Sequence, residues 1–258
     1  MLMMFGFVFP AAGQQIGDSY RIEVEHRPTI GEQLDLGREL AREARMVVDR
    51  QERMVAVGVA AAHLEDVRLR WPDEKRAVLM AKLIQADLYS STGLKVNAVE
   101  ALESVLDTSK EFPEHVQLLR ALGRDYVALG RGSEAKAVYD RLEGLEAFAN
   151  LTVAERSGAL ADIAESYRRF HMFEESAIRY ERAASLPGVR EIPSMVWLIA
   201  ATEDWLSAEH FQRAKASLAQ LEARFDKFNR QLPADDGSWH ARNSIAQSIS
   251  SIRSKLED

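Results

Sequence analysis

Apolar residues recur along most of the chain at the spacing of one helical face. The clearest stretch is residues 118–142, which holds two such runs. The first run lies three, one and three residues apart, at Leu119, Leu122, Gly123 and Tyr126, and the second lies four and three apart, at Ala135, Tyr139 and Leu142. A Gly-Arg-Gly break at 130–132 separates them. Because glycine interrupts helices, this stretch predicts two helices joined by a tight turn.

The same pattern occurs four times. An aromatic residue marks each first helix, and these aromatic marks are Tyr89, Tyr126, Tyr167 and Trp205, at steps of 37, 41 and 38 residues. Nine residues after each mark stands a small side chain: Ala98, Ala135, Ser176 and Ala214. Four and seven residues further on the chain is apolar, with Leu102, Tyr139, Tyr180 and Leu218, then Val105, Leu142, Ala183 and Leu221. Agreement at these offsets predicts stacked helical pairs.

Residues 118–142 resemble the tetratricopeptide repeat (TPR), whose pattern is W-x2-L-G-x2-Y, then A-x3-F, then P. Six of its positions are filled, with Leu119 for the Trp, Tyr139 for the Phe and Ala147 at the usual Pro. The chain is similar to bacterial members of that family. The resemblance implies an all-α fold, a right-handed α–α superhelix of four to five helix–turn–helix repeats with a C-terminal capping helix.

The predicted array covers residues 32–228. Its repeats would be residues 32–72, 74–110, 114–148, 153–187 and 193–228. The first of these is the least regular, with Gln51 at the aromatic mark, followed at the repeat offsets by Ala60, Leu64 and Val67. Because Gly58 is the only turn residue between Gln51 and Ala62, one long kinked helix is an equal alternative.

Both ends have patterns of their own. Residues 1–13 are apolar and end in small residues, which predicts a signal peptide, with a mis-set start or a cytosolic tail as alternatives. Residues 14–31 form a linker or arm, and Thr29 with Glu32 has the form of a capping box. Residues 238–257 predict a helix that Ser238 caps and under which Trp239 packs. Its apolar stripe would cover the end of the array or form a dimer, and consists of Ile245, Ile249, Ile252 and Leu256.

Composition narrows the function. The net charge of −7 disfavours nucleic acid as a partner, and the absence of cysteine removes thiol chemistry and disulfides. The apolar start is too short to span a bilayer. No metal-binding spacing joins the histidines, which fall on loops and helix ends: His26, His63, His115, His171, His210 and His240. With no nucleophile or phosphate-loop motif either, the sequence predicts no enzyme, no metal site and no cofactor.

The resemblance also implies which residues line the inner, concave face. These lie six and two residues before each mark and one and two after it. The predicted partner-binding residues among them are Asp87, Arg120, Arg124, Glu165, Arg168, Arg169 and Glu203. Alternatively these charges only solvate the face or pair with one another. The carboxylate clamp that some family members use for chaperone tails is absent, since Asp87 occupies its usual Asn position.

We therefore expect a non-catalytic scaffold that holds a peptide or protein segment in the groove, within a bacterial envelope complex. A segment with acidic residues near its middle, or a helix of a neighbouring protein, would suit the basic residues. The alternative is a regulatory sensor that responds to a ligand or peptide. Export to the periplasm follows from the signal peptide, and the cytoplasm is the alternative. The oligomeric state stays open.

Overall fold

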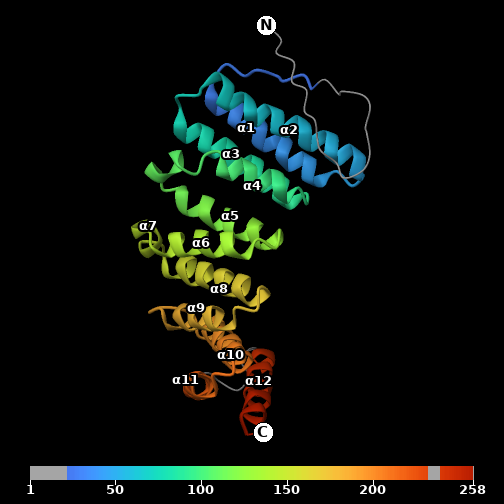
Figure 1. Ribbon diagram of the computed structural model, residues 1–258. Helices are drawn as coiled ribbons and strands as arrows, with labels where there is room; N and C mark the ends of the chain where they lie inside the picture. The colour runs from blue at the N-terminus through green and yellow to red at the C-terminus, as the bar shows by residue number, and fades with distance from the viewer. Residues whose placement is uncertain (1–21, 232–238, 258) are drawn as a thin grey trace. The chain divides into compact units, whose positions relative to one another are not determined.

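The computed structural model describes residues 22–231 and 239–257 (Figure 1), and within these ranges the regular elements are twelve α-helices and one 3₁₀ helix. They are α1 (Ile30–Met46), α2 (Arg50–Arg70), α3 (Lys75–Ser91), α4 (Lys95–Glu103), η1 (Thr108–Glu111), α5 (His115–Ala128), α6 (Gly132–Glu143), α7 (Glu146–Ala149), α8 (Val153–Arg169), α9 (Phe173–Ser185), α10 (Glu191–Ser207), α11 (Phe211–Gln231) and α12 (Trp239–Glu257). The predicted all-α fold is confirmed. The signal peptide predicted for residues 1–13 lies outside the described residues and stays a prediction.

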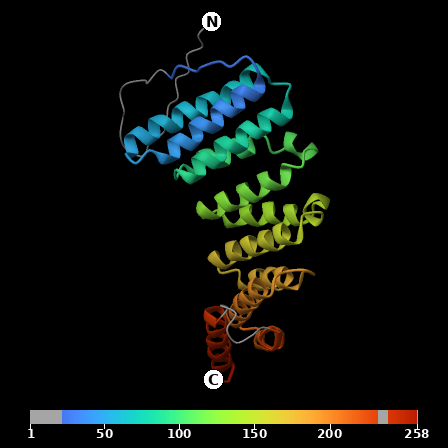
Figure 2. The ribbon, with the colours of Figure 1, turned by 180° about the vertical axis from the view of Figure 1, so that it is seen from behind.

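The chain divides into two compact units, residues 1–131 and 132–258. The division falls in the Gly-Arg-Gly turn, where Gly130 has a φ of 73°, a left-handed value that glycine adopts without a steric penalty. Within each unit, Figures 1 and 2 show the helices stacked side by side in chain order. Among the described helices, none combines the length and apolar content that crossing a membrane requires.

The predicted helical pairs bury their aromatic marks. Tyr89, Tyr126, Tyr167 and Trp205 all lie near the ends of first helices, α3, α5, α8 and α10, and are buried. The small residues nine positions later lie at the start of the second helices. Ser176, for example, is fully buried, and its Oγ lies 2.8 Å from the Ala164 carbonyl oxygen of α8. Part of the extra length of two of the repeats forms η1 and α7.

The most N-terminal helical pair differs from its prediction. The chain turns at residues 47–49, so Gln51 lies in the second helix, α2, rather than at the end of the first. Asp49 caps α2 by accepting hydrogen bonds from the backbone N–H groups of Gln51 and Glu52. As the alternative expected, no turn interrupts residues 51–62, which lie within the single helix α2. That helix does not extend back into the first one, because α1 ends at Met46.

The two helices of this pair pack closely at Gly37. A Cβ atom at Gly37 would lie 2.5 Å from the Leu64 side chain of α2, so only glycine fits that contact without a shift of Leu64. The predicted capping box is confirmed at the start of α1. There the backbone N–H of Glu32 donates to Thr29, and the backbone N–H of Thr29 donates to the Glu32 carboxylate.

Residues 22–28 lie against this first pair. The backbone N–H of Glu25 donates to His63 Nε2 at 3.0 Å, and the N–H of Arg27 donates to Gln33 Oε1 at 2.8 Å. His63 was expected on a loop or helix end, but it is buried in the middle of α2. An imidazole is tolerated there because both ring nitrogens have partners, the second being the Val59 carbonyl.

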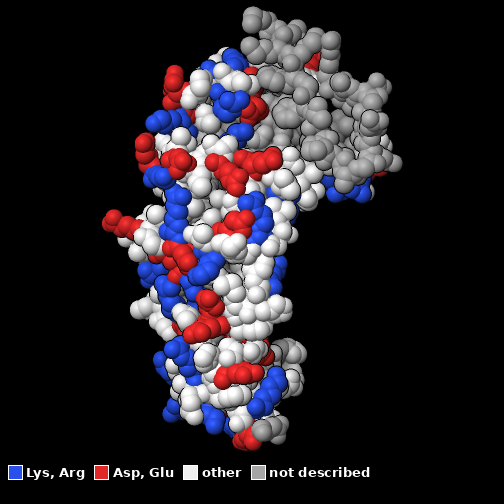
Figure 3. Space-filling view, viewed as in Figure 1, with Lys and Arg blue, Asp and Glu red and all other residues white. Residues whose placement is uncertain are grey.

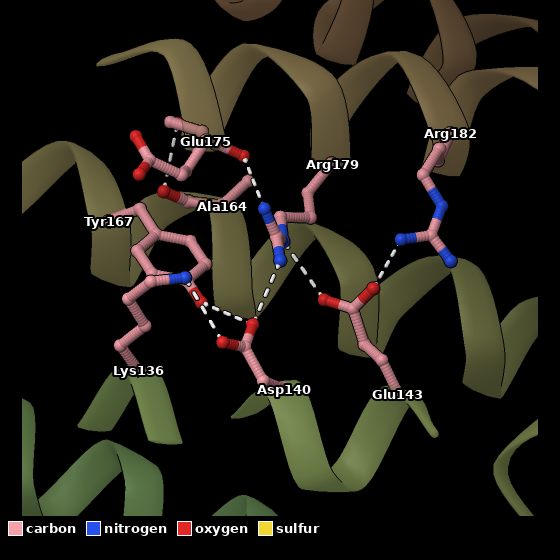
Figure 4. Close-up of polar contacts among 9 residues, drawn as sticks. Lys136, Asp140, Glu143, Ala164, Tyr167, Glu175, Arg179 and Arg182 are labelled. Carbon is pink, nitrogen blue, oxygen red and sulfur yellow. Dashed lines mark hydrogen bonds and ion pairs between the residues drawn. The ribbon is translucent and has the colours of Figure 1, made fainter. Parts of the chain in front are cut away.

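In the second unit, a network of ion pairs joins α6 to α9 (Figure 4). Arg179 Nε lies 2.9 Å from the Glu143 carboxylate, and Arg179 Nη2 lies 3.2 Å from Asp140. Arg182 pairs with the other oxygen of Glu143, and the Arg179 guanidinium stacks over the Tyr167 ring. These ion pairs thus join α6 and α9, the second helices of two successive repeats.

The last helix, α12, packs against α10 and α11. Its apolar stripe is buried in a cluster with Met195 and Leu198 of α10, and the stripe residues are Ile245, Ile249 and Ile252. Its polar side faces outward, as a cap on a helical array requires. Trp239, expected beneath this helix, is instead 58% exposed. The proposed Ser238 cap lies outside the described residues.

Candidate functional site

The predicted inner-face residues lie on the first helices, in their C-terminal halves except for Arg120, which lies near the middle of α5. Asp87, Arg120 and Arg124 belong to the first unit, on α3 and α5. The others belong to the second unit, on α8 and α10, and are Glu165, Arg168, Arg169 and Glu203. Because the division falls between the two sets, each is placed only against residues of its own unit.

Asp87 is bound by a residue that the sequence analysis missed. Arg45 Nη2 on α1 lies 2.5 Å from Asp87 Oδ2, and Arg45 Nε donates to Ser91 Oγ at 3.2 Å. The Arg45 side chain of α1 therefore lies beside these predicted inner-face positions of α3. The turn at residues 47–49 is the signal that would have placed Arg45 beside Asp87, since it fixes where the first helix ends.

The two arginines of α5 differ in exposure. Arg120 is partly buried, whereas Arg124 is exposed and forms no hydrogen bond or ion pair with any described residue. An unpaired surface arginine keeps its full hydrogen-bonding capacity for a partner's carboxylate or carbonyl groups. Arg124 is therefore the available cation of this helix.

A polar side chain precedes three of the four aromatic marks, and each is buried: Asp125, Ser166 and Asp204. Asp125 Oδ1 accepts hydrogen bonds from Ser90 Oγ at 2.6 Å and from Lys95 Nζ at 3.2 Å. Ser90 directly follows the mark of the preceding repeat, as Arg168 does in the second unit. The same two positions thus link one repeat to the next in both units.

Arg168 and Asp204 form the second of these links. Arg168 Nε donates to Asp204 Oδ1 at 2.7 Å, and Ser176 Oγ donates to Asp204 Oδ2 at 2.6 Å. Burial raises the pKa of Asp204, and its two donors partly offset that rise. Burial alone would lower the pKa of Arg168, but the Asp204 carboxylate outweighs it and the pKa is raised. Arg168 therefore mainly holds α8 against α10. Only the exposed part of its side chain can contact a partner.

Glu165 and Arg169 lie one turn apart on α8 and interact with each other. Arg169 Nε is 3.4 Å from Glu165 Oε1, and the Tyr180 hydroxyl donates to Glu165 Oε2 at 3.2 Å. Both charged side chains are exposed. For this pair the geometry matches the alternative in which inner-face charges pair among themselves.

A cleft of about 480 Å³ opens in the second unit where α8, α9, α10 and α12 meet. It is lined by Arg168, Phe173, Glu203, Asp204, Leu206, Ser207 and Lys255. Four of these occupy inner-face positions of two successive repeats, namely Arg168, Glu203, Leu206 and Ser207. Typical ligand sites span about 300–1,000 Å³, so this cleft is large enough to receive side chains of a partner.

The cleft combines an apolar floor with charged edges. Phe173 and Leu206 supply apolar surface, while Glu203 lies 3.6 Å from Arg168 Nη2. Lys255 is exposed and has no hydrogen-bond or ion-pair partner among the described residues. The sequence offered no way to place Lys255 here, because α12 lies outside the repeats and its register does not follow from theirs. Within the described ranges, no three His, Asp or Glu side chains cluster as metal ligands would.

No protein-family model and no curated protein matches the chain. Solved structures do match it. One is a protein of Podosopora anserina, described as kinesin light chain-like with nearly identical TPR-like repeats, at 20% identity and a TM-score of 0.58, covering 79% of this chain and 100% of that one. A single-substitution variant of it gives the same identity and TM-score over 80% of this chain and all of its own. BtubC from P. vanneervenii follows at 17% identity and a TM-score of 0.49, over 80% and 95%. The likeness shows a fold of TPR-like helical repeats.

Proposed function

We propose that this protein is a non-catalytic scaffold that binds a segment of a partner protein in the cleft of its second unit. The observation that carries the proposal is the composition of that cleft. Two successive repeats, centred on Tyr167 and Trp205, contribute inner-face side chains to one concave site. Stacked helical repeats commonly use such surfaces for binding.

The apolar and the charged residues of the cleft would contribute to binding in different ways. Phe173 and Leu206 offer the apolar contacts that usually anchor a protein interface. Each exposed ion pair contributes only about 0–1 kcal/mol, so Glu203 and Lys255 would set orientation and association rate rather than affinity. Asp204 is too buried to touch a partner and supports the site by holding Arg168 in place.

The wider setting belongs to the same proposal. Arg124 in the first unit is a further cation through which an acidic partner could be held. Export and membership of a bacterial envelope complex rest on the apolar residues 1–13 and on the resemblance to bacterial repeat proteins. They are separable from the binding site, which would act in the same way in another compartment.

Site-specific photo-crosslinking tests the binding site. A photoreactive amino acid at Ser207, which is exposed at the cleft, is expected to crosslink a distinct partner in cells of the native source. The matched control is Gln220, exposed on α11 and absent from the cleft lining. Crosslinking from Ser207 that Leu206→Asp abolishes would support the proposal. Equal crosslinking from both positions, or crosslinking from Gln220 alone, would place the binding site elsewhere.

A further inference from the structure

Helix α10 is apolar on two sides. Its run from Ile192 to Thr202 contains no charged residue. One side is buried in the core, where Met195 and Leu198 have no exposed surface. On another side, Val196 remains 49% exposed and Ile192 36% exposed. A helix that is apolar all round is normally covered all round, so the exposed side lacks a covering element within the described chain.

This exposed side leads into the cleft. Ile192, Val196, Ile199, Glu203 and Ser207 follow one another at steps of four, three, four and four residues, the spacing of one helical face. Ile192 and Val196 are exposed, whereas Ile199 is partly buried and packs against the cluster that α10 shares with α12. Glu203 and Ser207 line the cleft. At about 1.5 Å of rise per residue, the fifteen steps from Ile192 to Ser207 extend about 22 Å, enough for several residues of a bound peptide.

The far end of this face is polar and carries an unpaired cation. Glu203 lies 3.6 Å from Arg168 Nη2, and Arg168 Nε pairs with Asp204 at 2.7 Å, so one guanidinium is shared by two carboxylates. Lys255 on α12, in contrast, is exposed at the cleft without a partner among the described residues. Apolar surface therefore lies at one end of the face, and at the other lies an ammonium group that no described residue pairs with.

We propose that the exposed face of α10 and the cleft form one continuous docking surface for a partner segment of a defined polarity. That segment carries apolar side chains that cover Ile192 and Val196 and contact the exposed part of Ile199, followed by an acidic side chain that pairs with Lys255. This inference rests on the proposed function and adds the chemistry of the segment that the site binds.

Four fluorescent synthetic peptides of equal length test the polarity directly with the full chain. They combine an apolar Leu/Ile run or a Ser/Gly run with a terminal pair of either Glu or Lys. Fluorescence anisotropy is expected to show the tightest binding for the apolar run followed by Glu. The Ser/Gly run should lose at least tenfold in affinity, because apolar anchors dominate such interfaces.

Two substitutions test the polar end and the apolar end of the surface separately. Lys255→Glu is expected to reverse the preference, so that the peptide ending in Lys binds better than the one ending in Glu. Val196→Glu should remove the advantage of the apolar run. The matched control is Val96→Glu on α4, where a valine that is 56% exposed undergoes the same change outside the site. It should bind like the wild type, and circular dichroism checks that all three variants remain folded.

Any of four results would overturn the inference. One is equal binding of all four peptides, and another is a preference that Lys255→Glu leaves unchanged. The third is self-association of the wild type that Val196→Glu abolishes, because the face would then belong to a second copy of this chain. Crosslinking from Ser207 with no peptide binding would overturn this inference and leave the proposed function standing.

Discussion

Buried tyrosines recur in the cores of the helical pairs, and burial makes their ionisation unfavourable. Burial and the nearby Glu65 carboxylate raise the pKa of Tyr89 from 10.0 to about 12. Burial likewise raises the pKa of Tyr167 and of Tyr180. In an unfolded chain these phenols would ionise near their ordinary pKa, so the folded state binds protons that the unfolded state has lost.

The sign of the resulting pH dependence is fixed. Below the ordinary tyrosine pKa of about 10, both states are protonated and stability is unaffected. As the pH rises from there toward about 12, the unfolded state ionises first and the folded state loses stability. We predict that Tyr89→Phe reduces this alkaline loss, measured by denaturant unfolding across the range. Parallel pH profiles for the two proteins would contradict the assignment.

Single residues also show what the sequence could predict at the site. The offsets from the aromatic marks were enough to select Arg168 and Glu203, because inner-face positions follow from helix geometry. They could not show that Asp204 binds Arg168, since two side chains on different helices come together only through the packing of those helices. The polar residues directly before the marks were the available signal, because a polar residue at a buried position requires a partner.

At the scale of elements, the first helical pair shows how a missed turn shifts a register. The prediction expected a glycine or proline at the turn and found only Gly58. The chain turns instead at Asp49, which is followed three residues later by Glu52, the spacing of an N-terminal cap. With Gln51 assigned to the wrong helix, Arg45 and its pairing with Asp87 were missed.

The C-terminal helix α12 was predicted from its apolar stripe, and its role can be measured. Ile249→Ala opens a cavity in the cluster that it shares with α10 and α11. We predict a loss of about 2–5 kcal/mol in the free energy of unfolding, as for other buried large-to-small changes. The exposed neighbour Ser250→Ala should change little. A melting temperature that rises with protein concentration would instead support the dimerising helix. In that case the melting temperature of the Ile249→Ala variant should no longer depend on concentration.

At the scale of the whole molecule, charge offers little guide to a partner. On the face that Figure 3 shows, acidic and basic side chains are interspersed over the described residues of both units. The net charge of −7 is thus not gathered into one acidic surface on that face. The fold was predictable because the same pattern of buried positions recurs in four repeats. The cleft was only partly predictable, because Lys255 comes from a helix that occurs once.

In helical repeat proteins, the stability of each element depends mainly on the neighbours against which it packs. In the second unit, α10 packs against α9, α11 and α12, whereas α6 packs against α7 and α8. Leu198 on α10 and Leu160 on α8 are both fully buried, so replacing either by alanine creates a comparable cavity. Because cavities weaken the contacts around them, each should lower protection against local opening nearby rather than everywhere.

Hydrogen exchange measures this local opening helix by helix. We predict that Leu198→Ala speeds amide exchange mainly in α9–α12, and that Leu160→Ala does so mainly in α6, α8 and α9. The two variants serve as controls for each other, because the amino-acid change is the same and only its position differs. An equal rise in exchange throughout residues 132–231 in both variants would mean that this unit opens as a single cooperative block. Its docking face could then not respond separately from the rest of the unit.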